Sequence, residues 1–186
     1  MNPLLNNFRP CNPQEAADLP RFLELLETAP DAFERERAAG HFTASAWITD
    51  PAGERVVFVY HRIYDSWSWV GGHADGETDL AAVAKKEATE ETGLKRLRLL
   101  TPDVFSIELL PVAAHRRRGV FVPEHLHYNV TYLFSADPAD ALTGNPEENS
   151  GARWFLFDDA FAASSEKQMV DAVYKKLAEK TRAFFR

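Results

Sequence analysis

Cysteine is almost absent from this chain of 186 residues, in which Cys11 is the only one. A single cysteine excludes a disulfide within the chain, so the fold has to be stabilised by a hydrophobic core. Cys11 lies in a stretch rich in proline and asparagine, and we interpret it as structurally incidental.

An excess of positive charge is also missing, because 21 Lys and Arg face 28 Asp and Glu, for a net charge of -7. Proteins that bind nucleic-acid polymers use clustered basic side chains to displace counterions from the phosphates. We therefore expect no nucleic-acid partner. A small phosphorylated ligand remains compatible with this charge, since a bound metal ion supplies positive charge locally.

Long apolar runs are absent as well. No window approaches the roughly 20 apolar residues of a membrane-spanning helix, and the first residues, MNPLLNNFRPCNPQ, do not resemble a signal peptide. We expect a cytoplasmic protein without membrane contact, either a monomer or a homodimer.

Apolar residues make up 45% and charged residues 26% of the chain, which is typical of one soluble globular domain. The first forty residues carry helical signals: Pro13 opens a helix, and an apolar stripe follows that is broken near Pro20 and Pro30. We predict a helical prefix over residues 1–40, packed on a main domain over residues 41–186.

The main domain is predicted to combine strands and helices. Strands are expected over residues 41–49, 55–62, 97–110, 126–134 and 152–157, and helices over 79–92 and 164–184. In strand 126–134, alternation places His125, His127, Asn129 and Thr131 on the face opposite the apolar residues. Because strands and helices do not alternate regularly, we predict an α+β fold, an α/β/α sandwich around a mixed β-sheet.

The predicted helix 79–92 carries three glutamates on one face. It begins at the N-cap Asp79, ends at Gly93, and places Glu87, Glu90 and Glu91 within reach of one another. Such carboxylates repel each other without a cation, and Mg²⁺ prefers oxygen ligands. The alternative is a solvated helix face paired with neighbouring lysines.

The surrounding stretch, GGHADGETDLAAVAKKEATEETGL, resembles the signature of the Nudix hydrolase family. That signature reads Gly, five residues, Glu, seven residues, Arg-Glu, an aliphatic residue, any residue, Glu-Glu, any residue, Gly and an aliphatic residue. The positions in register are Gly72, Lys86, Glu87, Ala88, Glu90, Glu91, Gly93 and Leu94. Two positions depart: Thr78 replaces the early glutamate, with Glu77 beside it, and Lys86 replaces the arginine. The turn after the glycines resembles a subgroup with His-Ala-Asp-Gly.

The resemblance implies the Nudix fold and Mg²⁺-dependent hydrolysis, with Mn²⁺ as an alternative ion, of a nucleoside diphosphate linked to another moiety. It implies that the metal ligands are Gly72, Glu87, Glu90 and Glu91. The catalytic candidates are Glu90, Glu91, Lys86 and Glu148, the last in a polar loop that is otherwise read as a solvated surface. Which carboxylate accepts the proton from water is left open.

Four further residues are candidates for binding a small phosphorylated substrate: His73, Arg116, His125 and His127. His73 directly follows the glycines, and Arg116 belongs to a basic run. His125 and His127 share one strand face and could bind a phosphate or a second metal. The alternatives are a solvated basic loop and histidines hydrogen-bonded within the sheet.

Two other functions compete with hydrolysis. An isomerase of isopentenyl diphosphate uses a related fold but needs a cysteine near the site, and Cys11 lies far before the glycines. A catalytically weak or inactive Nudix domain that binds a nucleotide or metabolite is favoured only by Thr78 and Lys86. Since every carboxylate ligand is retained, we expect the hydrolase; its substrate is not determined by the sequence.

Overall fold

The computed structural model describes residues 3–62, 65–117, 119–145 and 149–186. Its centre is a mixed sheet of eight strands in which β1 (Gly40–Thr49) is parallel to β9 (His125–Ser135) and antiparallel to β2 (Arg55–His61) and β4 (Val70–His73). β10 (Asn149–Leu156) and β3 (Ser66–Ser68) pair with β2, whereas β5 (Arg98–Leu99) and β6 (Ser106–Val112) pair with β9.

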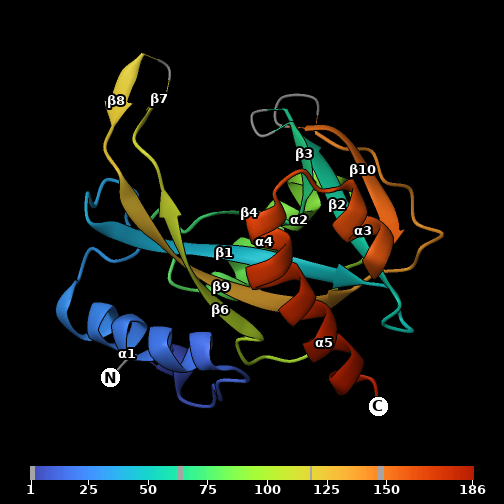
Figure 1. The fold of residues 1–186 in the computed structure, drawn as a ribbon, viewed down its shortest axis with the longest axis horizontal. Helices are drawn as coiled ribbons and strands as arrows, with labels where there is room; N and C mark the ends of the chain where they lie inside the picture. The colour runs from blue at the N-terminus through green and yellow to red at the C-terminus, as the bar shows by residue number, and fades with distance from the viewer. Residues whose placement is uncertain (1–2, 63–64, 118, 146–148) are drawn as a thin grey trace.

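Helices cover both faces of this sheet, and a separate hairpin of β7 (His115–Arg117) and β8 (Val120–Val122) projects from one end (Figure 1). After η1 (Pro3–Leu5), the helices are α1 (Pro13–Thr28), α2 (Leu80–Thr92), α3 (Phe157–Ala163), α4 (Lys167–Met169), the π-helical turn η2 (Val170–Tyr174) and α5 (Lys175–Phe184). The predicted α+β fold with a mixed sheet is confirmed.

Alternate residues of β1 belong to two hydrophobic cores. Phe42 and Ala44 pack in the core that includes Leu80 and Ala84 of α2. Trp47 points to the other face, where its ring stacks on that of Tyr174 with centroids 6.1 Å apart. α1 lies beside β6, and α2 lies behind the sheet in the view of Figure 1, with α4 and α5 in front.

Several predicted boundaries differ from the structure. Residues 97–110 form two strands rather than one, because Pro102 has no backbone N–H to donate to a strand ladder. Pro20 lies inside α1 without ending it; the helix ends before Ala29, which is extended as expected for a residue preceding proline. The last strand runs from Asn149 to Leu156, since Phe157 already begins α3.

The final helix begins at Lys167 rather than at residue 164 and contains the π turn. Within the described ranges, no helix is both long and apolar enough to cross a membrane. The division of the chain at residue 40 stays a prediction.

A network of buried polar groups lies between the sheet and α5. The ammonium group of Lys176 is 2.9 Å from a Glu108 carboxylate oxygen and 3.2 Å from one of Glu15. Asn129 donates to Glu108 over 2.8 Å, and Thr43 donates to Asn129 over 3.0 Å. The network therefore links α1, β6, α5, β9 and β1 through groups that are distant in sequence.

Candidate functional site

Helix α2 begins and ends at the predicted residues. The Asp79 carboxylate accepts a hydrogen bond of 3.0 Å from the N–H of Ala82. Gly93 has φ of 75°, and its N–H donates to the carbonyl of Thr89 over 2.9 Å. A Cβ at Gly93 would collide with the side chain of Thr143, so this left-handed cap requires glycine. These caps position the three glutamates of the helix.

Two of these glutamates turn toward β4. A Cβ added to Gly72 would lie 2.5 Å from the carboxyl carbon of Glu87, so only glycine allows this close approach. The N–H of Gly71 donates to the Glu91 carboxylate over 3.2 Å. The side chain of Glu91 is 2% exposed and that of Glu87 16%. The glycine pair therefore brings backbone next to both carboxylates.

Glu90 and Lys86 lie at the outer rim of this group. The Glu90 side chain is 50% exposed, and that of Lys86 is 66% exposed. The Lys86 ammonium lies 3.7 Å from carboxylate oxygens of both Glu87 and Glu90. The lysine that replaces the arginine of the signature thus bridges two glutamates from the solvent side. Together, Gly72, Glu87, Glu90 and Glu91 present oxygen donors of the kind that Mg²⁺ prefers.

His61 of β2 belongs to the same site but was not a candidate from the sequence. Its Nε2 lies 3.6 Å from an oxygen of Glu91. Asn149 of β10 supports the same helix turn, since its amide donates to the backbone carbonyl of Glu91 over 3.0 Å. No local pattern marks either residue, because each reaches α2 only through the pairing of β2 with β10.

Apart from the histidines, the remaining candidates are Thr78 with its neighbour Glu77, Glu148 and Arg116. Thr78 is exposed, and Glu77 accepts a hydrogen bond of 2.9 Å from the N–H of Asp79, which supports the turn before α2. Glu77 is therefore engaged with the backbone that leads into the helix. Glu148 lies outside the described residues. Arg116 is exposed on the β7–β8 hairpin, where it donates to the carbonyl of Gly119 over 3.1 Å.

The structure brings His73, His125 and His127 together with His41, which was not predicted. In the parallel ladder His41 is the partner of His127, and His73 is the partner of Thr43, two residues further along β1. Ring centroids of His41 and each of the other three are 5.1 Å apart. His41 could not be found from the sequence, because neither strand alone determines the register in which two parallel strands pair.

Burial shifts the titration of this group. Burial, together with the neighbouring histidines, lowers the pKa of His127 to about 3. Burial also lowers the pKa of His41. Both rings are therefore uncharged near neutral pH, which favours the neutral imidazole that acts as a donor of electrons.

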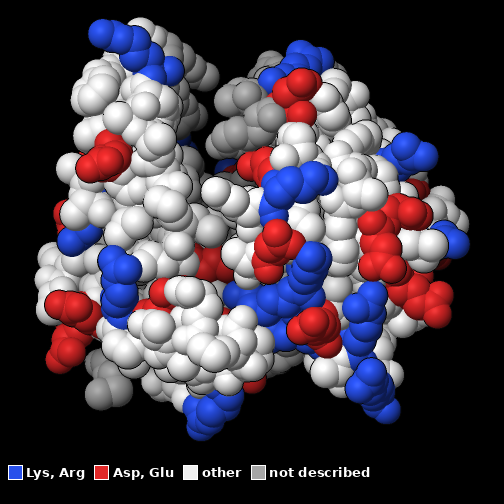
Figure 2. Space-filling model, viewed as in Figure 1, with Lys and Arg blue, Asp and Glu red and all other residues white. Residues whose placement is uncertain are grey.

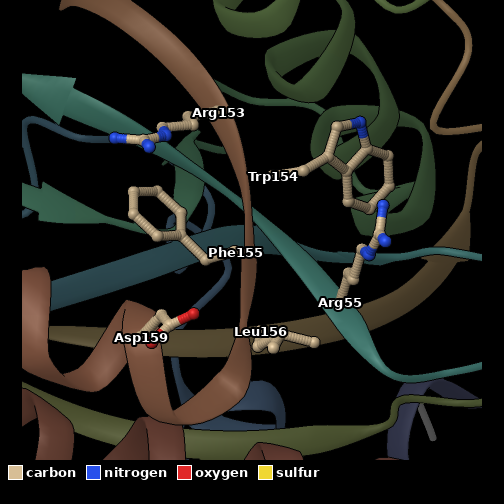
Figure 3. Close-up of a pocket in the computed structure, with 6 residues that line it drawn as sticks. All are labelled: Arg55, Arg153, Trp154, Phe155, Leu156 and Asp159. Atoms are coloured by element: carbon tan, nitrogen blue, oxygen red, sulfur yellow. The ribbon is translucent and has the colours of Figure 1, made fainter.

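The visible surface shows acidic and basic side chains interspersed, without a broad area of one sign among the described residues on that face (Figure 2). A hollow of about 320 Å³ lies at the edge strand β10. Figure 3 shows Arg153 and Phe155 on one side of that strand, Trp154 and Arg55 on the other, and Asp159 below them. None of the predicted site residues lines it.

A second, open hollow of about 350 Å³ lies on the outer face of α2 and includes Lys86 and Glu90. Of the three glutamates on the helix, only Glu90 borders this hollow, and its side chain is 50% exposed.

Comparison with known families identifies this architecture. The family described as NUDIX domain matches residues 40–178, which is more than half of the chain. The protein therefore belongs to the Nudix family, whose enzymes generally use divalent metal ions. The more specific subgroup with the His-Ala-Asp-Gly turn stays a prediction. No curated protein matches the sequence.

Several solved structures share the fold. An Ap4A hydrolase from C. elegans is 20% identical with a TM-score of 0.55, and the match covers 77% of this chain and 96% of that chain. The dihydroneopterin triphosphate pyrophosphohydrolase of E. coli is 14% identical with a TM-score of 0.54, covering 74% and 95%. A Nudix hydrolase from M. smegmatis is 19% identical with a TM-score of 0.55, covering 77% and 88%. At these identities the likeness establishes the fold.

Proposed function

We propose that this protein is a Mg²⁺-dependent hydrolase that cleaves a diphosphate linkage in a nucleoside diphosphate derivative or a related small molecule. The observation that carries the proposal is the approach of Gly72 to Glu87, with Glu91 held by the N–H of Gly71. Substrate identity remains open, because the two named hydrolases of similar fold act on different compounds and share under 25% identity with this chain.

Gly72, through its carbonyl, and Glu87, Glu90 and Glu91 would hold the metal. Bound Mg²⁺ would neutralise the diphosphate and lower the pKa of a water molecule for attack on phosphorus. The hydrogen bond from Gly71 and the nearby His61 keep the buried Glu91 in one orientation.

The exposed residues of the site would act on the substrate. Among the three glutamates of α2, Glu90 is the most open to solvent, so we assign it the proton of the attacking water. Lys86 would place its ammonium group against the phosphates, without the two-pronged geometry of an arginine. Glu148 stays an alternative proton acceptor, Arg116 and His73 stay predicted substrate ligands, and His125 and His127 stay predicted ligands of a phosphate or a second metal.

The test is turnover of a panel with Mg²⁺ or Mn²⁺: dinucleoside polyphosphates, ADP-ribose, nucleotide sugars and modified nucleoside triphosphates. Products are separated by chromatography. We expect hydrolysis of at least one compound and a decrease in kcat of at least about 100-fold in Glu91→Gln, because a charged metal ligand is lost. The matched control is Glu27→Gln, the same change on an exposed position of α1, with turnover within about twofold of the parent.

Two results would contradict the proposal. Equal turnover by Glu91→Gln and the parent would exclude the carboxylate group as the metal site. Binding of a panel compound without turnover of any compound would favour the alternative, a Nudix domain that binds a nucleotide or metabolite without hydrolysing it.

A further inference from the structure

Histidines gather where β1 and β9 begin and β4 ends. The chain has six histidines, and five of them form a chain of ring contacts with centroids between 4.9 and 6.4 Å apart. They come from four strands: His41 from β1, His73 from β4, His115 from β7, and His125 and His127 from β9. The five imidazole rings therefore come together only because these strands meet in the fold.

This group lies on the opposite sheet face from Glu87. Gly72 faces Glu87, and the alternation of side chains along β4 turns His73 to the other face. The ring centroids of His73 and His127 are 4.9 Å apart, and those of His73 and His41 are 5.1 Å apart. The histidine group is therefore a second collection of donors, distinct from the proposed carboxylate site although next to it in sequence.

The ring nitrogens are oriented in a consistent way. Nδ1 of His41 lies 3.4 Å from the carbonyl oxygen of Arg37, and Nδ1 of His125 lies 2.9 Å from that of Pro123. A carbonyl oxygen can only accept a hydrogen bond, so each of these rings carries its hydrogen on Nδ1, donates it to the carbonyl, and has the lone pair on Nε2. This is the arrangement by which protein backbone orients a histidine that binds a metal.

Nε2 of His41 gives the strongest single indication of a bound ligand. The His41 residue is 2% exposed, and this nitrogen has no hydrogen-bond partner within the described part of the chain. A buried polar atom is rarely left without a partner, since the loss of its hydrogen bond to water costs about 1–3 kcal/mol. A ligand that accepts the lone pair of Nε2 would remove this cost.

The distances also suit a metal ion. One ring nitrogen of each of His41, His73 and His127 lies within 4.8 Å of those of the other two. Nε2 of His125 is 3.2 Å from Nε2 of His127. Two nitrogens that each bind Zn²⁺ at 2.0–2.1 Å in a tetrahedron are about 3.3 Å apart. The contact between His125 and His127 already has this length, and side-chain rotations of His41 and His73 would bring their nitrogens toward the same centre.

We propose that His41, His73 and His127 bind a transition-metal ion, Zn²⁺ in particular, with His125 as the donor for the fourth position. An all-nitrogen ligand set suits Zn²⁺, Cu²⁺ or Ni²⁺ and not Mg²⁺, which prefers oxygen. His73 and His127 are partly exposed, so the ion reaches the site from solvent. The metal would tie β1, β4 and β9 together at the end where the β7–β8 hairpin projects.

The test is metal binding by the purified chain in the presence of excess Mg²⁺, which occupies oxygen sites. Co²⁺ serves as a visible probe, because tetrahedral nitrogen ligation absorbs far more strongly than octahedral oxygen ligation. We expect one intense Co²⁺ spectrum per chain that Zn²⁺ abolishes. Competition with a chromophoric chelator then gives the Zn²⁺ affinity, which we expect to fall at least about tenfold in His127→Gln and in His41→Gln.

Two matched variants separate this site from the carboxylates. His61→Gln removes the one histidine outside the group, and Glu91→Gln removes a carboxylate; both should keep the Co²⁺ spectrum. Circular dichroism and thermal unfolding verify that each variant is folded. Because the parent chain alone gives the spectrum, a variant that misfolds does not prevent the test.

Absence of the intense Co²⁺ spectrum in the parent would overturn the proposal, as would Zn²⁺ binding that survives His127→Gln and is lost in Glu91→Gln. Either result leaves hydrolysis by the carboxylate site untouched. Conversely, failure of every diphosphate compound to be hydrolysed does not change the expected Co²⁺ spectrum.

Discussion

Lys86 and Lys176 have the same kind of ion pairs, since each ammonium group lies within ion-pair distance of two glutamates. The Lys86 side chain is 66% exposed, and its distances to Glu87 and Glu90 are both 3.7 Å. The Lys176 side chain is 8% exposed, with distances of 2.9 and 3.2 Å to Glu108 and Glu15. The difference lies in where the glutamate partners come from: the helix that carries Lys86 supplies both of its partners, whereas α1 and β6 each supply one partner of Lys176.

This difference determines what each lysine does. Water screens the charges around Lys86, so its pairs contribute little to stability and the ammonium stays available to a ligand. Around Lys176 no water replaces a lost partner, and removal of one ion leaves the others buried without compensation. Burial alone would lower the pKa of Lys176, but Glu108 and Glu15 raise it instead. We therefore expect Lys176 to act on stability and Lys86 on turnover.

The largest expected effect is that of Lys176→Met. The change keeps the length and apolar stem of the side chain but leaves the Glu108 carboxylate without its cation, which should lower the free energy of unfolding by about 3–5 kcal/mol. Urea unfolding followed by circular dichroism measures it. A decrease under about 1 kcal/mol would mean that the remaining hydrogen bonds of Glu108 suffice, and the contrast with Lys86 would fail.

The second-largest expected effect is the dependence of folding stability on pH that comes from Glu15. Burial by itself would raise the pKa of this carboxyl, but the N–H of Cys11 and the cations Lys176 and Lys180 outweigh it and lower the pKa to about 2. A lowered pKa in the folded state contributes stability that is present above the ordinary value of 4.5 and is lost as pH falls toward 2.

Glu15→Gln should therefore lower the free energy of unfolding at pH 7 by about 2–4 kcal/mol. Its difference from the parent should narrow by about 1.4 kcal/mol per pH unit below pH 4.5. Urea unfolding of both proteins from pH 7 to pH 3.5 measures the difference. A difference that stays constant across this range would show that the carboxylate charge of Glu15 is not what stabilises the network.

The smallest expected effect is that of Lys86→Met, the matched change at the exposed lysine. We expect the free energy of unfolding to stay within about 0.5 kcal/mol of the parent. The kcat/KM for a hydrolysed diphosphate should fall by less than about tenfold, since a solvent-screened charge at the rim contributes modestly. A loss of stability comparable to that of Lys176→Met would remove the distinction between the two lysines.

The predictable part of the site is the part that is local in sequence. The helix caps at Asp79 and Gly93 and the shared face of the glutamates follow from spacings within one short segment, whereas the role of Gly72 was implied by the family resemblance. The face of β9 that carries His125, His127, Asn129 and Thr131 also follows, because alternation along a strand requires no knowledge of its neighbours.

The sequence by itself therefore determined the family signature, the long strands of the sheet and the oxygen donors on α2, whereas the short strands β3 and β4 were not predicted. Only the tertiary structure decided that His41 lies beside His127, that His61 lies beside Glu91, and that Lys176 joins Glu15 to Glu108. The physical reason is that the register of a parallel strand pair and the packing of distant helices depend on the sum of many weak contacts across the core. Helix caps and side-chain periodicity instead depend on a few neighbouring residues.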